Sequence, residues 1–200
     1  MKQLDVSDQR QLLAIARRTI ASAVCRAAKV DRAPGRLPHA LTAPAAAFVT
    51  IHEHGELRGC IGLMRFEAPL WVNVRDAARA AALDDPRFLP VDESELPELQ
   101  LEISVLDPPV KLADPADFVA GRHGIVVERG SRRALLLPQV ATEMGWNASQ
   151  MLEAVCLKAY LPADSWRDSA TRLMVFESTC FSDAIDSYAD AAAETQPLIG

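Results

Sequence analysis

The segment "ELRGCIGLM", Glu56 to Met64, places Arg58 and Cys60 within an otherwise apolar stretch of the chain. Residues two apart in an extended strand share one face and lie about 7 Å apart along it, which is within reach of a side chain. A neighbouring guanidinium favours the thiolate form of cysteine, and the thiolate is the nucleophile. Cys60 is therefore a candidate catalytic residue, and Arg58 is a candidate for binding the charge of a substrate.

Two glycines flank this cysteine in the same segment, Gly59 and Gly62. Glycine inside a strand often marks a place where a ligand or another backbone approaches closely, so both are candidate substrate-binding positions. A purely structural explanation competes with this one, because cysteine is among the most buried residue types and packs as a small apolar side chain. The sequence leaves both alternatives open.

Arg58 requires a partner if its strand face is apolar, because desolvation of an unpaired guanidinium is costly. Glu56, Glu102 and Asp85 are the acidic candidates. We expect a two-pronged contact of Arg58 with Glu102, with Asp85 or with a bound anion, which is the geometry that a planar guanidinium favours. Asp85 and Arg87 of "DDPRF", together with Glu102, join the candidate substrate-binding residues. The alternative for "DDPRF" is a rigid turn that ends a helix.

His123 is the histidine of most interest among the four, because it lies between Gly121 and Gly124 directly before a predicted strand. Such a position can present a side chain to a cleft, although a turn histidine without function fits the pattern equally well. With Cys60 it would form a nucleophile and base pair only if folding brings the two within hydrogen-bond reach.

Composition excludes several classes of function. The 200 residues carry a formal net charge of −6, which argues against a nucleic-acid-binding domain. The four cysteines are far apart, without a C-x-x-C pair, so we expect neither a metal site nor a cofactor bound through one. The amino-terminal segment carries charges through its apolar stretch and lacks the core of a signal peptide or membrane span, which predicts a cytoplasmic protein without membrane contact.

Hydrophobic periodicity predicts helices alternating with hairpins, and hence an α+β fold with mostly antiparallel sheet and flanking helices. A turn at His54 and Gly55 is expected to set a regular register in which Val49 faces Cys60 and Ile51 faces Arg58. The other predicted elements are a helix over 7–29 capped by Ser7, a helix over 69–83, a strand over 99–109, a hairpin of 125–128 with 134–137, a helix capped by Asn147, a last strand over 172–181, and a loosely ordered acidic tail over 183–200.

These landmarks, in this order, resemble the AMMECR domain family, in particular its bacterial branch called AmmeMemoRadiSam system protein A. "LRGCIG", Leu57 to Gly62, is similar to the signature hexapeptide of the family. "DPRF", "LEISVL", "HGIVV", "LPQVA" and "CLKA" are similar to its later blocks. The resemblance covers residues 7–182.

The resemblance implies a larger lobe that carries both termini, a smaller lobe, and a cleft between them near the hexapeptide strand. It supplies no reaction. The name of the branch implies a pathway shared with a Memo-type protein and a radical-SAM protein. We expect the chain to be an enzyme or enzyme subunit of that pathway that binds a small substrate. The alternative is a non-catalytic adaptor that docks those two partners. One departure is Tyr160, because the family usually has glycine after Lys158 and Ala159, and a left-handed helix end would cost tyrosine more.

Overall fold

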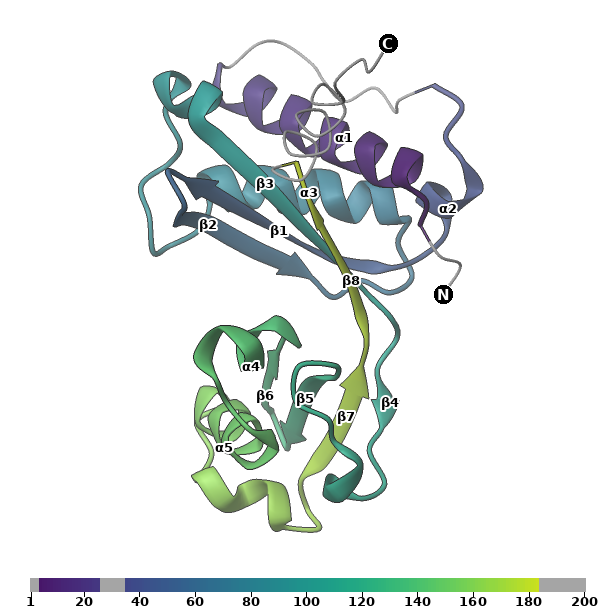
Figure 1. Cartoon of the computed structure of the whole chain (residues 1–200), viewed down its shortest axis with the longest axis vertical. Helices are drawn as coiled ribbons and strands as arrows, with labels where there is room; N and C mark the ends of the chain where they lie inside the picture. The colour runs from purple at the N-terminus through teal and green to yellow at the C-terminus, as the bar shows by residue number, and fades with distance from the viewer. Residues whose placement is uncertain (1–3, 26–34, 184–200) are drawn as a thin grey trace, which may run out of the picture. The chain divides into compact units, whose positions relative to one another are not determined.

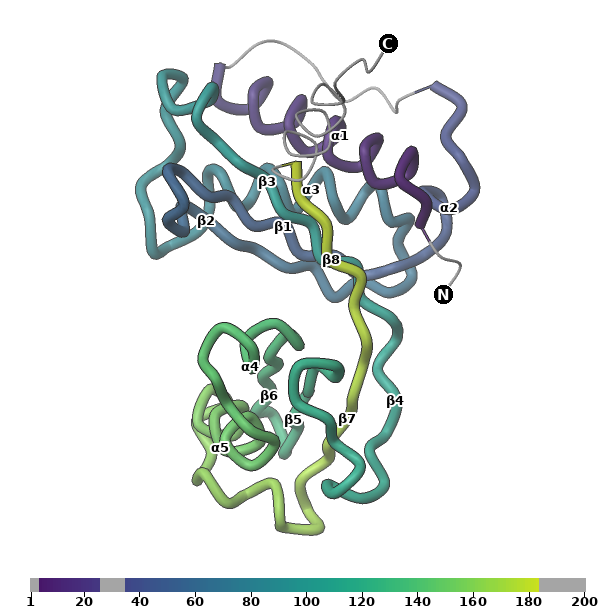
Figure 2. The backbone as a smooth tube through the Cα atoms, viewed as in Figure 1, coloured from purple at the N-terminus to yellow at the C-terminus, as the bar shows by residue number. Residues whose placement is uncertain are grey.

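The computed structural model of the chain describes residues 4–25 and 35–183. The chain divides into two compact units, Met1–Val105 together with Cys180–Gly200, and Leu106–Thr179. The second unit is therefore inserted into the sequence of the first, and the tube in Figure 2 shows the two places where the chain passes from one unit to the other. Each unit has its own antiparallel pairs and its own core, which confirms the predicted α+β class.

The first unit is a four-stranded sheet in the order β2-β1-β3-β8, with helices α1 and α3 on one face (Figure 1). Apolar side chains of β1 and β3 point to the helices at every second position, and together they form the core of this unit. Its elements are α1 (Val6–Val24), α2 (His39–Thr42), β1 (Ala46–Glu53), β2 (Glu56–Leu63), α3 (Leu70–Leu83), the short 3-10 helix η1 (Glu93–Glu98), β3 (Leu99–Leu106) and β8 (Ser178–Ser182).

Helix α1 begins earlier than Ser7 would place it. The N-cap is Asp5, whose carboxylate accepts the backbone N–H of Asp8 at 2.8 Å, while the Asp8 side chain accepts the N–H of Asp5 in return. This reciprocal pair satisfies two backbone donors that a helix start leaves without partners, which a serine at position 7 would not do. The helix ends at Val24, and the predicted continuation beyond Cys25 lies outside the described residues.

The hairpin of β1 and β2 has the predicted turn but not the predicted register. His54 and Gly55 both have positive φ, 52° and 83°, as a tight two-residue hairpin turn requires. Near the turn His52 pairs with Leu57, but one position further from the turn Ile51 pairs with Gly59. Arg58 is therefore the extra residue of a β-bulge, and the pairing beyond it is shifted by one residue. Cys60 consequently faces Thr50, and not Val49 as a regular register would have it.

The second unit is a four-stranded sheet in the order β4-β7-β5-β6, with α5 packed against β5 and β6. Helix α5 starts with the predicted capping box of Asn147 and Gln150, and its buried face lies in the core of this unit. The elements are β4 (Val110–Lys111), the 3-10 turn η2 (Pro115–Asp117), β5 (Gly124–Arg129), β6 (Arg132–Leu136), α4 (Gln139–Met144), α5 (Ala148–Lys158), the 3-10 helix η3 (Ala163–Arg167) and β7 (Arg172–Phe176).

The last predicted strand is two strands. Only Glu177 separates β7 from β8, and each belongs to a different sheet. The short helices α2 and α4 were not predicted, because four and six residues are too few for a helical period to stand out. The predicted tail begins at the last described residue, Asp183, and the rest of it lies outside the described residues.

Candidate functional site

Cys60 lies on the face of the first sheet opposite the helices. Its neighbour Gly59 faces α3, so the alternation of β2 turns Cys60 the other way, onto the same face as Thr50. The Thr50 hydroxyl donates to Cys60 Sγ at 3.3 Å, and Cys60 is half-buried. The thiol is therefore not part of the apolar core, and its near partner is a hydroxyl group.

Asp85 fixes the backbone of Cys60. It follows directly after Asp84, the C-cap of α3, and its carboxylate accepts the Cys60 N–H at 2.9 Å. Only 2% of the Asp85 side chain is exposed, and Arg87 donates to both of its oxygens, from Nε at 3.0 Å and from Nη2 at 2.7 Å. These bonds from the Arg87 side chain hold the pKa of Asp85 well below its ordinary value, against the opposite effect of burial.

Arg87 combines a fixed position with remaining capacity to donate. Its Nη2 also donates to the Cys60 carbonyl oxygen at 3.3 Å, so Asp85 and Arg87 together engage both backbone groups of Cys60 on the edge of the sheet. Its remaining amino group, Nη1, meets no acceptor among the residues that the structure describes. The side chain is 53% exposed, so this guanidinium is an anchored cation with a donor still available beside Cys60.

Arg58 does form the predicted two-pronged contact, but with Glu95 and not with Glu102 or Asp85. Its Nε donates to Glu95 Oε1 at 2.6 Å and its Nη2 to Oε2 at 3.1 Å. Its amino groups also donate to the carbonyl oxygens of Leu89 and Pro90. The hydrogen bond from Arg58 lowers the pKa of Glu95 and raises that of Arg58. Arg58 ties the loop after α3 to β2, and its donors are already engaged.

Packing within the first unit accounts for both glycines of the hexapeptide. A Cβ on Gly59 would lie 2.3 Å from the carbonyl oxygen of Ala81, because α3 crosses the strand there with backbone against backbone. A Cβ on Gly62 would lie 2.1 Å from the ring of Phe48. The close approach that glycine predicts is thus present, and helix and ring provide it.

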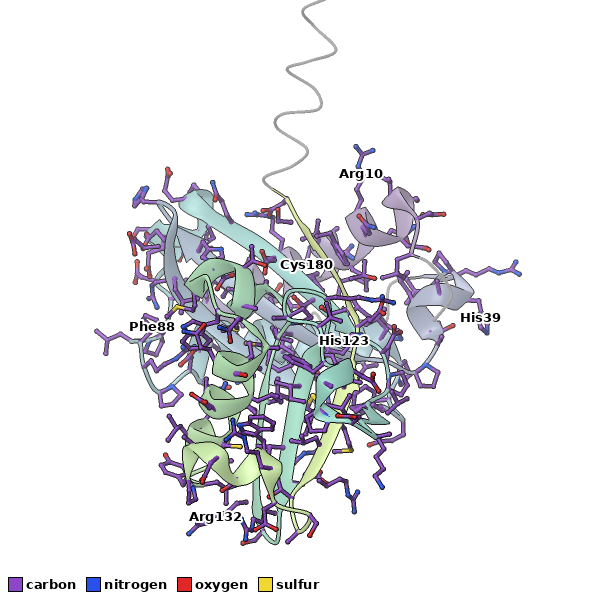
Figure 3. All side chains as sticks on the ribbon, turned by 60° about the horizontal axis from the view of Figure 1, so that its bottom comes forward. Arg10, His39, Phe88, His123, Arg132 and Cys180 are labelled. Carbon is purple, nitrogen blue, oxygen red and sulfur yellow. The ribbon has the colours of Figure 1, made fainter. Side chains whose placement is uncertain are left out.

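The remaining predicted residues are Glu102 of the first unit and His123 of the second. Glu102 is on β3, on the same sheet face as Cys60, since its neighbours Leu101 and Ile103 belong to the core. His123 belongs to the second unit, where it precedes β5 and its Nδ1 accepts the Val119 N–H at 3.2 Å (Figure 3). A working pair of His123 with Cys60 therefore stays a prediction.

Residues 4–25 and 35–183 lack two other kinds of feature. No helix in these ranges is both long enough and apolar enough to cross a membrane. The same residues contain no cluster of three or more histidine, cysteine or acidic side chains that could hold a metal ion.

Comparison with known proteins places the chain in a family. The family model described as AMMECR1 matches residues 13–181. The chain belongs to the AMMECR1 family. A protein of Methanothermobacter thermautotrophicus is 41% identical over 186 residues, covering 90% of this chain and 96% of that protein. A protein of Aquifex aeolicus is 36% identical over 162 residues, covering 78% and 83%.

A solved structure supports the fold. The crystal structure of an uncharacterized protein from Pyrococcus horikoshii matches with a TM-score of 0.81 and 36% sequence identity, over 86% of this chain and 89% of that chain. The AMMECR1 fold described above therefore has an experimental counterpart.

In this AMMECR1 chain two sequence blocks that are distant in sequence meet at one point. The hexapeptide supplies Cys60, and "DPRF", Asp85 to Phe88, supplies the ion pair that binds its backbone. The sequence analysis named Cys60, Asp85 and Arg87 as candidates but did not predict that they contact one another. It missed Thr50, which only the bulge brings opposite Cys60, and Glu95, one of several carboxylates in the acidic segment of η1.

Tyr160 occupies the helix end where the sequence resemblance leads us to expect glycine. Its φ is 58°, in the left-handed region, so the helix end keeps the conformation that glycine would favour. The Leu161 N–H donates to the carbonyl oxygen of Cys156 at 2.9 Å, and the Tyr160 N–H donates to that of Leu157, also at 2.9 Å. This is the Schellman ending of a helix, and here it tolerates an exposed tyrosine.

Proposed function

We propose that this AMMECR1 protein is an enzyme, or a subunit of one, that binds a small anionic or carbonyl-bearing substrate beside β2. One observation carries the proposal: an ion pair engages both backbone groups of Cys60, while its half-buried thiol receives a hydrogen bond from Thr50. A core cysteine would need neither device. Reacting groups, in contrast, must be held in place by supporting hydrogen bonds of this kind.

In this proposal Cys60 is the nucleophile and Arg87 binds the charge of the substrate through Nη1. Arg87 takes the part first expected of Arg58, whose donors already serve Glu95 and two carbonyl oxygens. Asp85 is a positioning residue, because it orients Arg87 and the backbone of Cys60 without reaching the substrate itself. His123 remains the proposed base.

The finer assignment rests on the sequence resemblance. We propose that the protein works in the cytoplasm and belongs to the AmmeMemoRadiSam branch, in one pathway with a Memo-type protein and a radical-SAM protein. The names of the relatives in Methanothermobacter thermautotrophicus and Aquifex aeolicus state no activity.

Thiol reactivity tests the proposal. Native protein is treated with iodoacetamide at neutral pH, and mass spectrometry follows alkylation of each cysteine separately. Cys180 is the matched control, because it is exposed on another strand of the same sheet. We expect Cys60 to react faster than Cys180 despite its lower exposure, and Arg87→Gln to slow Cys60 alone. Complete protection of Cys60 until denaturant is added would refute the nucleophile.

An adaptor that docks those partners is the second candidate. The observation in its favour is the exposure of two large apolar side chains, Leu57 at 41% and Leu89 at 83%. Leu57 precedes Arg58 in the chain, and the backbone of Leu89 accepts a hydrogen bond from Arg58. Exposed apolar surface is typical of interaction sites. A double variant Leu57→Ser, Leu89→Ser that loses a co-purifying Memo-type or radical-SAM partner, while Cys60 alkylation is unchanged, would favour the adaptor.

A further inference from the structure

Strand β2 has one edge without a neighbouring strand, because it is the first in the sheet order β2-β1-β3-β8 (Figure 1). The N–H and C=O groups of successive residues in a strand point alternately to its two edges. Those of Cys60 point to the open edge, since they bond to Asp85 and Arg87 and not to β1. The groups of Gly62 therefore point to the same edge, whereas those of Ile61 point towards β1.

The main chain of Gly62 is available to a ligand. Neither its N–H nor its C=O forms a hydrogen bond with any residue that the structure describes. Gly62 is half-buried, and because glycine has no side chain, all of its exposed surface belongs to the main chain. Closer to the turn this edge is protected, by the bulge at Arg58 and by the ion pair at Cys60, in the way that proteins commonly protect an edge. Gly62 follows directly after this protected part.

Arg87 adds a charged donor at the same place. Its Nη2 donates to the Cys60 carbonyl oxygen at 3.3 Å, and the Gly62 N–H is the next group that points outward along this edge. Its Nη1 has no acceptor among the described residues, and 53% of the side chain is exposed. The carboxylate of Asp85 is buried on the other side of this guanidinium. A ligand carboxylate could therefore accept from Arg87 Nη1 with one oxygen and from the Gly62 N–H with the other.

A residue in an antiparallel strand matches both groups of Gly62. In such a pair the C=O of the incoming residue accepts the Gly62 N–H, and its own N–H donates to the Gly62 C=O. When the incoming residue is the last of a polypeptide, its C=O belongs to the terminal carboxylate, whose second oxygen can accept from Arg87. Its side chain then lies on the same sheet face as Phe48, which pairs with Gly62 and is half-buried. An apolar last side chain suits this ring.

We infer that the open edge of β2 binds the carboxyl-terminal end of an extended polypeptide. The last residue of this polypeptide pairs with Gly62 as an added strand, and its terminal carboxylate binds Arg87. The inference rests on the proposed function, because it gives a chemical class to the anion that Arg87 binds: the end of a peptide chain. Main-chain hydrogen bonds supply most of the affinity in this mode of binding, so peptides of different sequence share it.

Calorimetric titration of the full chain with the peptide acetyl-Ala-Val-Ala-Leu, which has a free terminal carboxylate, tests the inference. Two altered peptides each remove one contact. Amidation of the carboxyl terminus removes the charge that Arg87 binds, and N-methylation of the last residue removes the N–H that donates to the Gly62 C=O. We expect the parent peptide to bind with a Kd below about 1 mM, and each altered peptide to bind at least tenfold more weakly. Acetate, a carboxylate without a peptide backbone, should bind no better than the altered peptides.

Amide hydrogen exchange and one variant locate the bound peptide. In the free protein the Gly62 N–H should exchange rapidly and the Ile61 N–H slowly, since only the Ile61 N–H points to β1. Saturating peptide should slow exchange at Gly62 at least fivefold and leave Ile61 unchanged. Arg87→Gln should weaken the parent peptide at least tenfold. The matched control Arg79→Gln changes an exposed arginine of the same unit that pairs with Asp84, and it should leave Kd within twofold.

Absent binding of the parent peptide, equal binding of the altered peptides, or unchanged exchange at Gly62 in its presence would each overturn the inference. Circular dichroism checks the folding of Arg87→Gln, and if this variant does not fold, the altered peptides decide. Alkylation of Cys60 separates this inference from the proposed function. Peptide binding by a protein whose Cys60 is unreactive would keep the peptide site and exclude the nucleophile, whereas a reactive Cys60 without peptide binding would exclude the peptide site alone.

Discussion

Replacing Asp85 with asparagine should destabilise the first unit by about 2.5–4.5 kcal/mol. The change removes a charge-assisted, two-pronged bond to Arg87, and a bond to a charged group contributes about 1.5–3 kcal/mol. Half of the Arg87 side chain is exposed, so water can hydrate its guanidinium once the bond to Asp85 is lost. The cost of losing this bond should therefore be near the low end of that range, about 1.5 kcal/mol. The NH₂ group of asparagine would also face the N–H donors of Cys60 and Arg87 that now bind Asp85. One buried donor is then left without an acceptor, which costs about 1–3 kcal/mol.

Urea unfolding at pH 7 measures this loss, with Asp84→Asn as the matched control. Asp84 is the preceding residue and pairs with Arg79, but both side chains are more than half exposed, so its loss should cost below about 1 kcal/mol. Amide hydrogen exchange at Cys60 provides a local readout, since its N–H bonds to Asp85. If Asp85→Asn is no more destabilising than Asp84→Asn, the ion pair does not hold β2 and the reasoning fails.

The pH dependence of the same comparison has a definite sign. The folded-state pKa of Asp85 is depressed, so its contribution is fully present above the unfolded value, about 3.9, and is lost as pH falls through the folded value. The difference in unfolding free energy between wild type and Asp85→Asn should thus be constant from pH 7 to about pH 5 and shrink in stronger acid. A difference that grows on acidification would contradict this.

Three further substitutions follow from the contacts. Tyr160→Gly should stabilise the protein by about 0.5–1 kcal/mol in thermal unfolding, because it relieves a positive φ, whereas Tyr160→Ala should give no gain; equal gains would exclude strain. Arg58→Lys should cost about 1–3 kcal/mol in urea unfolding by losing the two-pronged contact with Glu95, and a neutral result would show that one ammonium suffices. Gly59→Ala should cost about 1–3 kcal/mol by pushing against a backbone carbonyl of α3, whereas Gly35→Ala, with open space around it, should be neutral; similar costs would refute the packing explanation.

Local features of the fold were predictable from the sequence. The hairpin turn at His54 and Gly55 and the capping box at Asn147 each depend on residues within three positions of one another, so a short segment determines them. The alternation of β3 and the length of α3 were equally readable, since each buries one face against a single core.

Features set by distant contacts were not. No local signal in the sequence marks the bulge at Arg58. The bulge places Cys60 opposite Thr50 instead of Val49, and so on the other face of the sheet, because strand faces alternate with every residue. Glu95 is 37 residues from Arg58, among the other carboxylates of η1, so only the tertiary fold selects it. The site residues were therefore nameable by type, but their partners were not.

The interrupted order of the first unit has a consequence for biosynthesis. β3 ends at Leu106, where the second unit begins, but its neighbour β8 starts only at Ser178, where that unit is nearly complete. A nascent chain therefore exposes the edge of β3 while 74 residues of the inserted unit emerge from the ribosome, Leu106–Thr179. The unpaired edge of a strand can pair with another chain. The second unit must therefore fold promptly by itself, so that β8 can pair with β3 of the same chain.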